Sequence, residues 1–561
     1  HLEVLSRMAQ HAEVNLFLLN PCRQYWGEIV SERELARLEK QGEGEQQWYE
    51  TGNPLLASWG KLGRDFFNAI IDGCGEHDRH DSFGALPQGS LLHEVQADIV
   101  ELRGAESGVR QVQPGDLSLK VHSCHSPMRE VEVLYDTLLS IFDADPSLSP
   151  RDVLVMTPDI ESYAPYISAV FGNPEPGAER IPYSIADRSL KNEGEAAQAL
   201  LAILGLCGGR YGVATVLDIL ESPPVARRFG LSEDDLETVR DWLREANVRW
   251  GIDAAQRTEH GVPPFHENSW AAGLDRLLLG YAMNGDGRSF YNGILPFDDM
   301  EGGVALVFGR FLTFCEKLFA DTKALSRTRP PADWVPVLRR LLDDFILPDQ
   351  DGEREFLSLI EIAKKLGECG TEAGFRGEVG IEAVRYWVEQ QLGSSERGLG
   401  FLTGGVTFCA MLPMRSIPFP VVALIGMDEG QFPRRNPAQG FDLMTADRRP
   451  GDRSPRDEDR YLFLEALLST RNRLHISYVG QSIKDNAELP PSVLVSELLD
   501  YLERCFVTPE GKPAGQVQKH PLQPFSQKYF TGSPGLFSYS RHNCAGAVAK
   551  LSPPAPPPPS L

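Results

Sequence analysis

Short apolar runs lie on both sides of a long helical region, and they define the organisation of the chain. They are rich in β-branched residues and end at glycine or proline, which is typical of strands buried on both faces of a parallel sheet. The expected strands cover residues 14–19, 117–124, 152–156, 406–411, 421–425 and 474–480, with a further strand and turn at 181–190. Ser126-Pro127 predicts the start of a helix, and residues 459–468 have helical spacing.

The pattern changes between about residues 191 and 390, where apolar positions recur with the period of an amphipathic helix. The expected helices are 196–206, 213–220, 234–247, 270–279, 304–322, 331–345, 353–366 and 380–392. We therefore expect an α/β domain in two halves, 116–190 and 404–505, interrupted by a helical insertion at 191–403.

Composition narrows the class of protein. The 561 residues are 42% hydrophobic and 24% charged, as in soluble globular proteins of several domains. No run of 18 apolar residues predicts a membrane span. The nine cysteines are scattered, which is typical of free thiols in a reducing cytoplasm. The start at His1 has neither an initiator Met nor a signal sequence, so we expect a central piece of a longer protein. The net charge of −24 argues against a DNA-coated surface but is compatible with a narrow basic channel.

The motifs of catalysis are missing from the sequence. No Gly-x₄-Gly-Lys-[Ser/Thr] phosphate loop occurs, and Gly60-Lys61 lacks both the first glycine and the hydroxyl residue that follows the lysine. No strand carries the carboxylates and lysine of a Mg²⁺-dependent nuclease. We therefore expect no catalytic residue in this chain. Two groups of metal-binding residue types lack the paired spacing of zinc sites, so we expect no metal: Cys74, His77 and His80, and His122, Cys124 and His125.

The order of elements after residue 404 resembles the last two motifs of UvrD/RecB-type superfamily 1 DNA helicases. The resemblance implies RecA-like, P-loop NTPase-like parallel-sheet domains with a large helical insertion. In active members a Thr touches the DNA backbone, and Thr407 matches it. A Lys-Gly-Leu-Glu turn couples ATP to movement in those enzymes, whereas Arg415-Ser416-Ile417-Pro418 stands here. The family's ATP-sensing arginine falls on the following helix, where Arg460 and Arg471 are degenerate matches.

Two sequence segments resemble the RecC family, the gamma subunits of exodeoxyribonuclease V. They are Pro-Met-Arg-Ser-Ile-Pro-Phe and Arg-Asp-Glu-Asp-Arg-Tyr-Leu-Phe-Leu-Glu-Ala. That resemblance implies a non-motor DNA-binding scaffold that joins RecB-like and RecD-like subunits. It also implies a role in double-strand break repair by homologous recombination in the bacterial cytoplasm, where the subunit splits duplex DNA and channels a strand for recognition of a Chi-type signal. The complex would use ATP and Mg²⁺. Residues 1–115 would end the first RecA-like domain with a helical subdomain, and 506–561 would be a linker and Pro-rich tail.

The resemblance and the residue types together suggest a DNA path. Thr407, Met414 and Arg415 would lie at the strand-to-turn edge that faces single-stranded DNA in helicases. A nearby loop interleaves aromatic residues with the arginines Arg434, Arg435, Arg448 and Arg453, which suits phosphate contact and base stacking. An equally open alternative for this loop is that the arginines of residues 448–460 pair internally with the aspartates Asp442, Asp447, Asp452, Asp457 and Asp459.

Two other functions remain open at this point. The chain could belong to an active ATP-dependent helicase whose phosphate loop lies upstream, although the altered turn at Arg415 speaks against this. Its acidic charge also allows a protein-interaction module without DNA contact.

Overall fold

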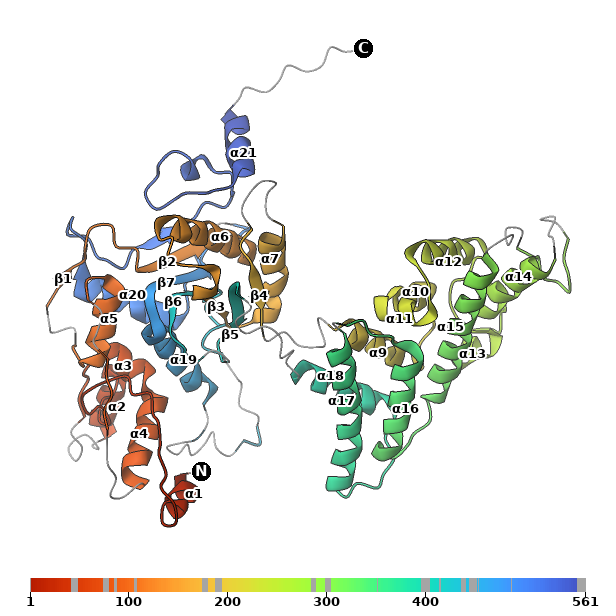
Figure 1. The fold of residues 1–561 in the computed structure, drawn as a ribbon, viewed down its shortest axis with the longest axis horizontal. Coiled ribbons are helices and arrows are strands. Elements are labelled where there is room, and N and C mark those ends of the chain that lie inside the picture. The colour runs from red at the N-terminus through yellow and green to blue at the C-terminus, as the bar shows by residue number, and fades with distance from the viewer. Residues whose placement is uncertain are drawn as a thin grey trace, which may run out of the picture. The chain divides into compact units, whose positions relative to one another are not determined.

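The chain forms two compact units in the computed structural model (Figure 1). One unit comprises His1–Asp187 and Gly398–Leu561, and the other comprises Arg188–Arg397. The structure describes residues 2–41, 49–73, 80–84, 88–104, 108–173, 180–186, 194–283, 289–297, 304–350, 352–394, 404–412, 415–434, 440–442, 452, 454–485 and 487–551.

The first unit is built on a seven-stranded parallel sheet. Its order is β4-β5-β3-β6-β7-β2-β9, and every strand pair is parallel. The strands are β2 (Leu119–Cys124), β3 (Val153–Thr157), β4 (Tyr183–Ile185), β5 (Val406–Ala410), β6 (Phe419–Leu424), β7 (Thr470–Val479) and β9 (Val517–Lys519). The predicted α/β fold is confirmed. Strands from both sides of the helical block share the sheet, since β3 pairs with β5 and β6 and β2 pairs with β7.

Helices cover both faces of this sheet, as Figure 1 shows. One face packs against α3 (Pro54–Trp59), α5 (Leu91–Val100), α19 (Pro455–Ser469) and α20 (Val493–Cys505), and the other against α6 (Pro127–Ala144) and α7 (Ile160–Gly172). The buried strand residues alternate between the two cores because successive side chains point to opposite faces. Ser126 caps α6 by accepting a hydrogen bond from the Arg129 amide at 3.2 Å, and Pro127 occupies the first turn.

Two expectations about this unit are wrong. Val14–Leu19 forms no strand, and the Phe17 side chain is 95% exposed. An apolar run becomes a strand only where another strand pairs with its backbone, and the described residues provide none for this segment. Residues 506–561 are not simply a linker, because β9 pairs with β2 at the sheet edge. The tail also contains α21 (Arg541–Leu551) and β8 (Phe506–Val507), which pairs with β1 (Arg110–Gln111). Its Pro-rich end at 552–561 lies outside the described residues.

Three further helices belong to the N-terminal part of the first unit. They are α1 (Leu2–Met8), α2 (Glu32–Gln41) and α4 (Lys61–Gly73). Helix α4 packs against α3 and α19, so it lies beside the face that carries several of the expected site residues.

The second unit is helical, and each helix expected from the pattern is present. Its helices are α9 (Glu195–Leu206), α10 (Val213–Glu221), α11 (Pro223–Phe229), α12 (Glu233–Glu245), α13 (Ala254–Glu259), α14 (Trp270–Ala282), α15 (Val304–Ala324), α16 (Pro331–Phe345), α17 (Glu353–Glu372) and α18 (Ile381–Ser394). The pattern missed α11 and α13. Helix α11 begins with two prolines that suggest a turn, and α13 has only six residues, too short for a clear period.

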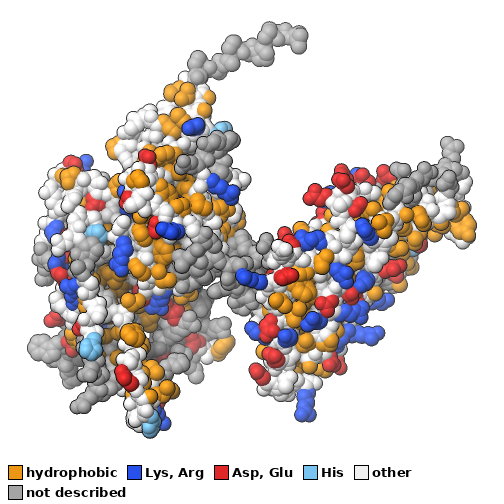
Figure 2. Space-filling view, in the orientation of Figure 1, with side chains coloured by type: hydrophobic (Ala, Val, Ile, Leu, Met, Phe, Trp, Pro, Cys, Tyr) orange, Lys and Arg blue, Asp and Glu red, His pale blue; other side chains and the backbone are white. Residues whose placement is uncertain are grey.

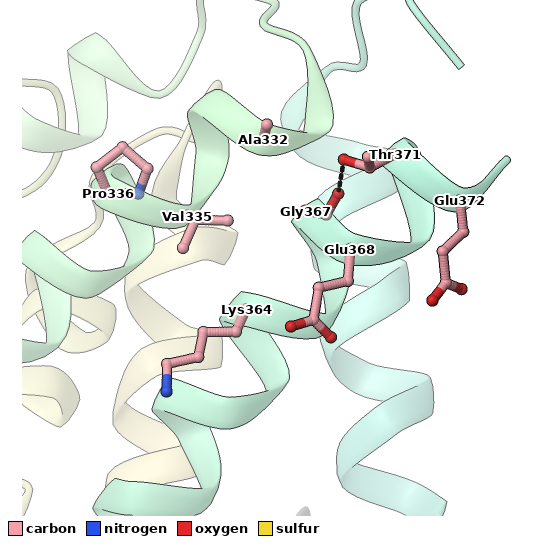
Figure 3. Close-up of a pocket in the computed structure, with 8 residues that line it drawn as sticks. All are labelled: Ala332, Val335, Pro336, Lys364, Gly367, Glu368, Thr371 and Glu372. Carbon is pink, nitrogen blue, oxygen red and sulfur yellow. Dashed lines mark hydrogen bonds between the residues drawn. The ribbon is translucent and has the colours of Figure 1, made fainter. Parts of the chain in front are cut away.

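Helices α16 and α17 approach closely because α17 contains glycines at the contact. A β-carbon at Gly367 would lie 2.8 Å from Val335, and one at Gly370 would lie 2.8 Å from Pro331. An open groove of about 580 Å³ runs between the two helices, with Lys364, Glu368 and Glu372 on its α17 side (Figure 3). Among the described helices of the whole chain, none combines the length and apolar character needed to cross a membrane.

Candidate functional site

Helix α19 brings together the described site residues Arg415, Arg434 and Arg460. Ser454 caps the helix by accepting a hydrogen bond from the Asp457 amide, and Pro455 stands in the first turn. The helix carries Asp457, Asp459, Arg460, Tyr461 and Glu465. These side chains contact groups from other segments of the first unit, which are Ser58, Lys61, Arg415, Arg434 and Glu497.

Arg415 lies against the middle of α19. Its Nε pairs with the Glu465 carboxylate, and its guanidinium carbon lies 5.3 Å from the centre of the Tyr461 ring. The side chain is 42% exposed. Within the described part of the chain, its two terminal nitrogens have no hydrogen-bond partner. The arrangement combines a cation–π contact with an edge of the guanidinium group that is open to an anion.

Arg434 is engaged by a buried carboxylate. Its Nη2 donates to Asp459 Oδ1 at 2.6 Å, its Nε lies 3.1 Å from both oxygens, and its backbone N–H donates to Oδ2 at 2.6 Å. The Asp459 side chain has no exposed surface. For Arg434, the geometry supports internal pairing. The expected site residues Met414, Arg435, Arg448 and Arg453 lie outside the described residues.

Thr407 lies in β5, where it pairs with Leu154 of β3 and Ser184 of β4. It is 1% exposed. Its place is therefore in the interior of the sheet, and in this structure its side chain has no surface to offer to DNA.

Arg460, a degenerate match to the ATP-sensing position, makes an internal network. Its Nη1 donates to Ser58 Oγ at 2.6 Å, and its Nη2 lies 3.2 Å from Glu497 Oε1. Glu497 also accepts hydrogen bonds from Trp59 Nε1 at 2.6 Å and from Ser58 Oγ at 2.8 Å. The network joins α3, α19 and α20. A cavity of about 540 Å³ lies beside it, lined in part by Ser58, Glu497 and Tyr501.

Arg471, the other degenerate match, is the second residue of β7, and its side chain is exposed. Its backbone carbonyl accepts a hydrogen bond from His93 Nε2 at 2.7 Å. The side chains of Arg460 and Arg471 therefore have different surroundings, and the carboxylate network holds only Arg460.

A cluster of buried histidines lies on the α6 side of the sheet, and the sequence analysis singled out His122 but not its partners His475 and His520. His122 Nδ1 lies 2.9 Å from His520 Nε2, and the His122 and His475 rings stack with centres 4.3 Å apart. Burial lowers the pKa of His122 to about 4 and the pKa values of His475 and His520 well below the usual range. The described residues contain no group of three or more side chains arranged to hold a metal ion.

A buried carboxylate at the carboxyl ends of the central strands was also missed. Glu130 accepts hydrogen bonds from Tyr163 Oη at 2.6 Å, Ser477 Oγ at 2.6 Å and the Gly426 amide at 3.1 Å. Burial, with a smaller contribution from Asp428, raises the pKa of Glu130 to about 7. Its partners are up to 347 residues away in sequence, so no local signal connects them.

The charged surface is mixed. Figure 2 shows acidic and basic side chains interspersed on the visible face of the helical unit, without a continuous basic patch among the described residues drawn there.

Comparison with known proteins identifies relatives of both units. The sequence model of the RecC N-terminal domain matches residues 1–102, and that of the RecBCD enzyme subunit RecC fourth domain matches 193–396. The second match lies inside the helical unit. Proteins named RecBCD enzyme subunit RecC are similar along most of the chain: 39% identity over 91% of it in Escherichia coli K12, 35% over 94% in Haemophilus influenzae Rd and 35% over 94% in Mycolicibacterium smegmatis.

The chain spans about half the length of these curated relatives, covering 48%, 49% and 48% of them respectively. These matches cover 91% to 94% of the chain and so extend over both units. This chain belongs to the RecC family.

Proposed function

We propose that this chain is part of the non-motor, DNA-binding scaffold subunit of an exodeoxyribonuclease V. In that role it joins RecB-like and RecD-like subunits, splits duplex DNA and channels one strand for recognition of a Chi-type signal. It acts in double-strand break repair by homologous recombination, in the bacterial cytoplasm. The observation that carries the proposal is the 39% identity to a RecBCD enzyme subunit over 91% of the chain.

The geometry of Arg415 supports a DNA contact in this unit. A guanidinium group with one face on an aromatic ring, and with two terminal nitrogens that have no partner among the described residues, suits a phosphate oxygen pair. Arg434 makes a weaker case, because Asp459 already accepts from its Nε and Nη2.

The surroundings of Arg460 support a chain that is not itself a motor. Glu497 and Ser58 accept the hydrogen bonds that an ATP-sensing arginine would make to a phosphate. ATP and Mg²⁺ are then used by the other subunits of the complex. We expect the purified chain to hydrolyse no ATP with or without DNA. DNA-stimulated phosphate release that is abolished by Arg471→Ala would contradict this.

The test of the proposal is assembly. The full-length protein should be expressed with the RecB-like and RecD-like subunits of the same organism, each tagged in turn. Co-purification of all three and ATP-dependent unwinding and degradation of linear duplex DNA by the complex are expected. Failure of the full-length protein to join the other subunits would overturn the proposal.

A further inference from the structure

We propose that Tyr461 and Gly63 are positioning residues that hold Arg415 ready to contact a phosphate of single-stranded DNA. This inference rests on the proposed function, because it identifies what orients an arginine that this function places on the DNA path.

The contacts of Arg415 leave one part of its guanidinium group available. One face lies over the Tyr461 ring, and Nε pairs with Glu465. Tyr461 and Glu465 are one helical turn apart on α19, so they meet the arginine together. The two terminal nitrogens have no partner among the described residues, and they are the groups that form two parallel bonds to a phosphate.

The position of Tyr461 is itself set by α4. Tyr461 is buried, and its ring packs against Gly63 so closely that a β-carbon at Gly63 would overlap the ring. Gly63 is therefore the residue that allows the ring to lie where it supports Arg415. Burial raises the pKa of Tyr461 to about 12, so the ring bears no charge at neutral pH.

Arg434 and Arg460, the other two described site arginines that contact α19 or belong to it, do not keep both terminal nitrogens available. Asp459 accepts from Nε and Nη2 of Arg434, and Ser58 and Glu497 accept from both terminal nitrogens of Arg460. A phosphate would have to displace a carboxylate from either. Arg415 is held at its face and at Nε alone, so a phosphate can bind without breaking either contact.

The experiment measures binding of a fluorescent oligo(dT) to the assembled complex across a salt series, with thermal unfolding of each variant as control. Arg415→Ala should weaken binding and lower the slope of log K against log salt by about 0.7 unit, the value for one phosphate on a single strand. Tyr461→Leu should lower the slope by the same amount although it removes no charge. Tyr461→Phe keeps the ring and should retain the full slope.

Two further variants separate positioning from a general loss of structure. The double variant Arg415→Ala/Tyr461→Leu should lose no more slope than either single variant, because both act on one contact. Gly63→Ala, if the complex assembles, should reproduce Tyr461→Leu.

The outcomes distinguish the DNA contact of Arg415 from the positioning roles of Tyr461 and Gly63. If Arg415→Ala leaves the slope unchanged, the DNA path on this face is wrong and the positioning roles fall with it. If Arg415→Ala lowers the slope but Tyr461→Leu retains it, the DNA contact stands and the positioning role is overturned.

Discussion

Arg434 and Asp459 form a bidentate ion pair in which one partner is buried. The Asp459 carboxylate has no exposed surface, and it accepts from Arg434 Nη2 at 2.6 Å and from the Arg434 backbone N–H at 2.6 Å. A buried carboxylate needs such partners because removing a charge from water is costly. The pair therefore ties Arg434, which follows β6 in the chain, to the first turns of α19.

Arg434→Ala should destabilise the protein by about 3 kcal/mol, the lower end for breaking a buried pair, because the backbone bond to Asp459 remains. Urea unfolding at pH 7.5 measures the effect. The matched control is Arg456→Ala, a substitution of an exposed arginine on α19, the helix that carries Asp459, and it should change stability by less than about 0.5 kcal/mol. Equal stability of the two variants, with a reduced DNA salt slope only for Arg434→Ala, would show that Arg434 contacts DNA instead.

Glu497→Ala should loosen α3 from α20. The substitution removes the acceptor for Trp59 Nε1 and Ser58 Oγ and leaves the guanidinium group of Arg460 without its carboxylate. We expect a loss of about 3 kcal/mol and faster amide hydrogen exchange in Pro54–Trp59. Glu497→Gln keeps acceptor oxygen and should have a smaller effect on exchange. Unchanged exchange of α3 in the Ala variant would contradict the coupling.

His475→Leu should reduce the sensitivity of the protein to acid. Neither ring nitrogen of His475 has a hydrogen-bond partner among the described residues, and its folded-state pKa lies well below the usual value near 6.5. A histidine with a depressed pKa costs stability as pH falls below its unfolded pKa, because only the unfolded state takes up the proton. The variant should match the wild type at pH 7.5 and lose less stability from pH 6.5 to pH 4.

The measurement is the difference in unfolding free energy between variant and wild type across that range. Variant and wild type both contain Glu130 and Asp136, whose pKa values burial raises to about 7 and about 6. The opposing contributions of these two carboxyl groups therefore cancel when the two unfolding free energies are subtracted. The slope of the difference should approach 1.4 kcal/mol per pH unit for one proton. Parallel curves for variant and wild type would refute the assignment.

Glu130→Gln should gain stability relative to the wild type as pH rises from about 4.5 to about 7. The folded-state pKa of Glu130 is raised, so its contribution is fully present below the unfolded pKa and is lost through the folded pKa. Glutamine keeps an acceptor for Ser477 and the Gly426 amide but carries no buried charge. Unfolding free energies at pH 5 and pH 8 test this, with Glu132→Gln as a control on the same helix. The contradicting result is a relative stability of Glu130→Gln that falls with pH.

The strands and helices of the core were predictable from local pattern. Val153–Thr157 and Val406–Ala410 lie in short apolar runs rich in β-branched residues, and the α19 segment has helical spacing, so each is indicated by its own residues. The short strand Val517–Lys519 was not predictable, because two of its three residues are polar and no apolar run marks it. It forms a strand because it pairs with the edge of β2. The exposed segment Val14–Leu19 shows the reverse, an apolar run without a pairing partner among the described residues.

The properties of the candidate site likewise fall into those that the sequence determines and those that the tertiary structure decides. The sequence alone determined that the chain lacks a phosphate loop and that its residues resemble the RecC family, and it predicted Arg415 in a turn after a strand and Arg434 in a loop. Only the tertiary structure decided that Asp459 pairs with Arg434, that the Arg415 guanidinium lies over the Tyr461 ring and that Thr407 is buried. Residue type and spacing specify local structure and available chemistry. Which charges are neutralised depends on contacts between segments far apart in the chain, and those contacts form only when the sheet brings the segments together.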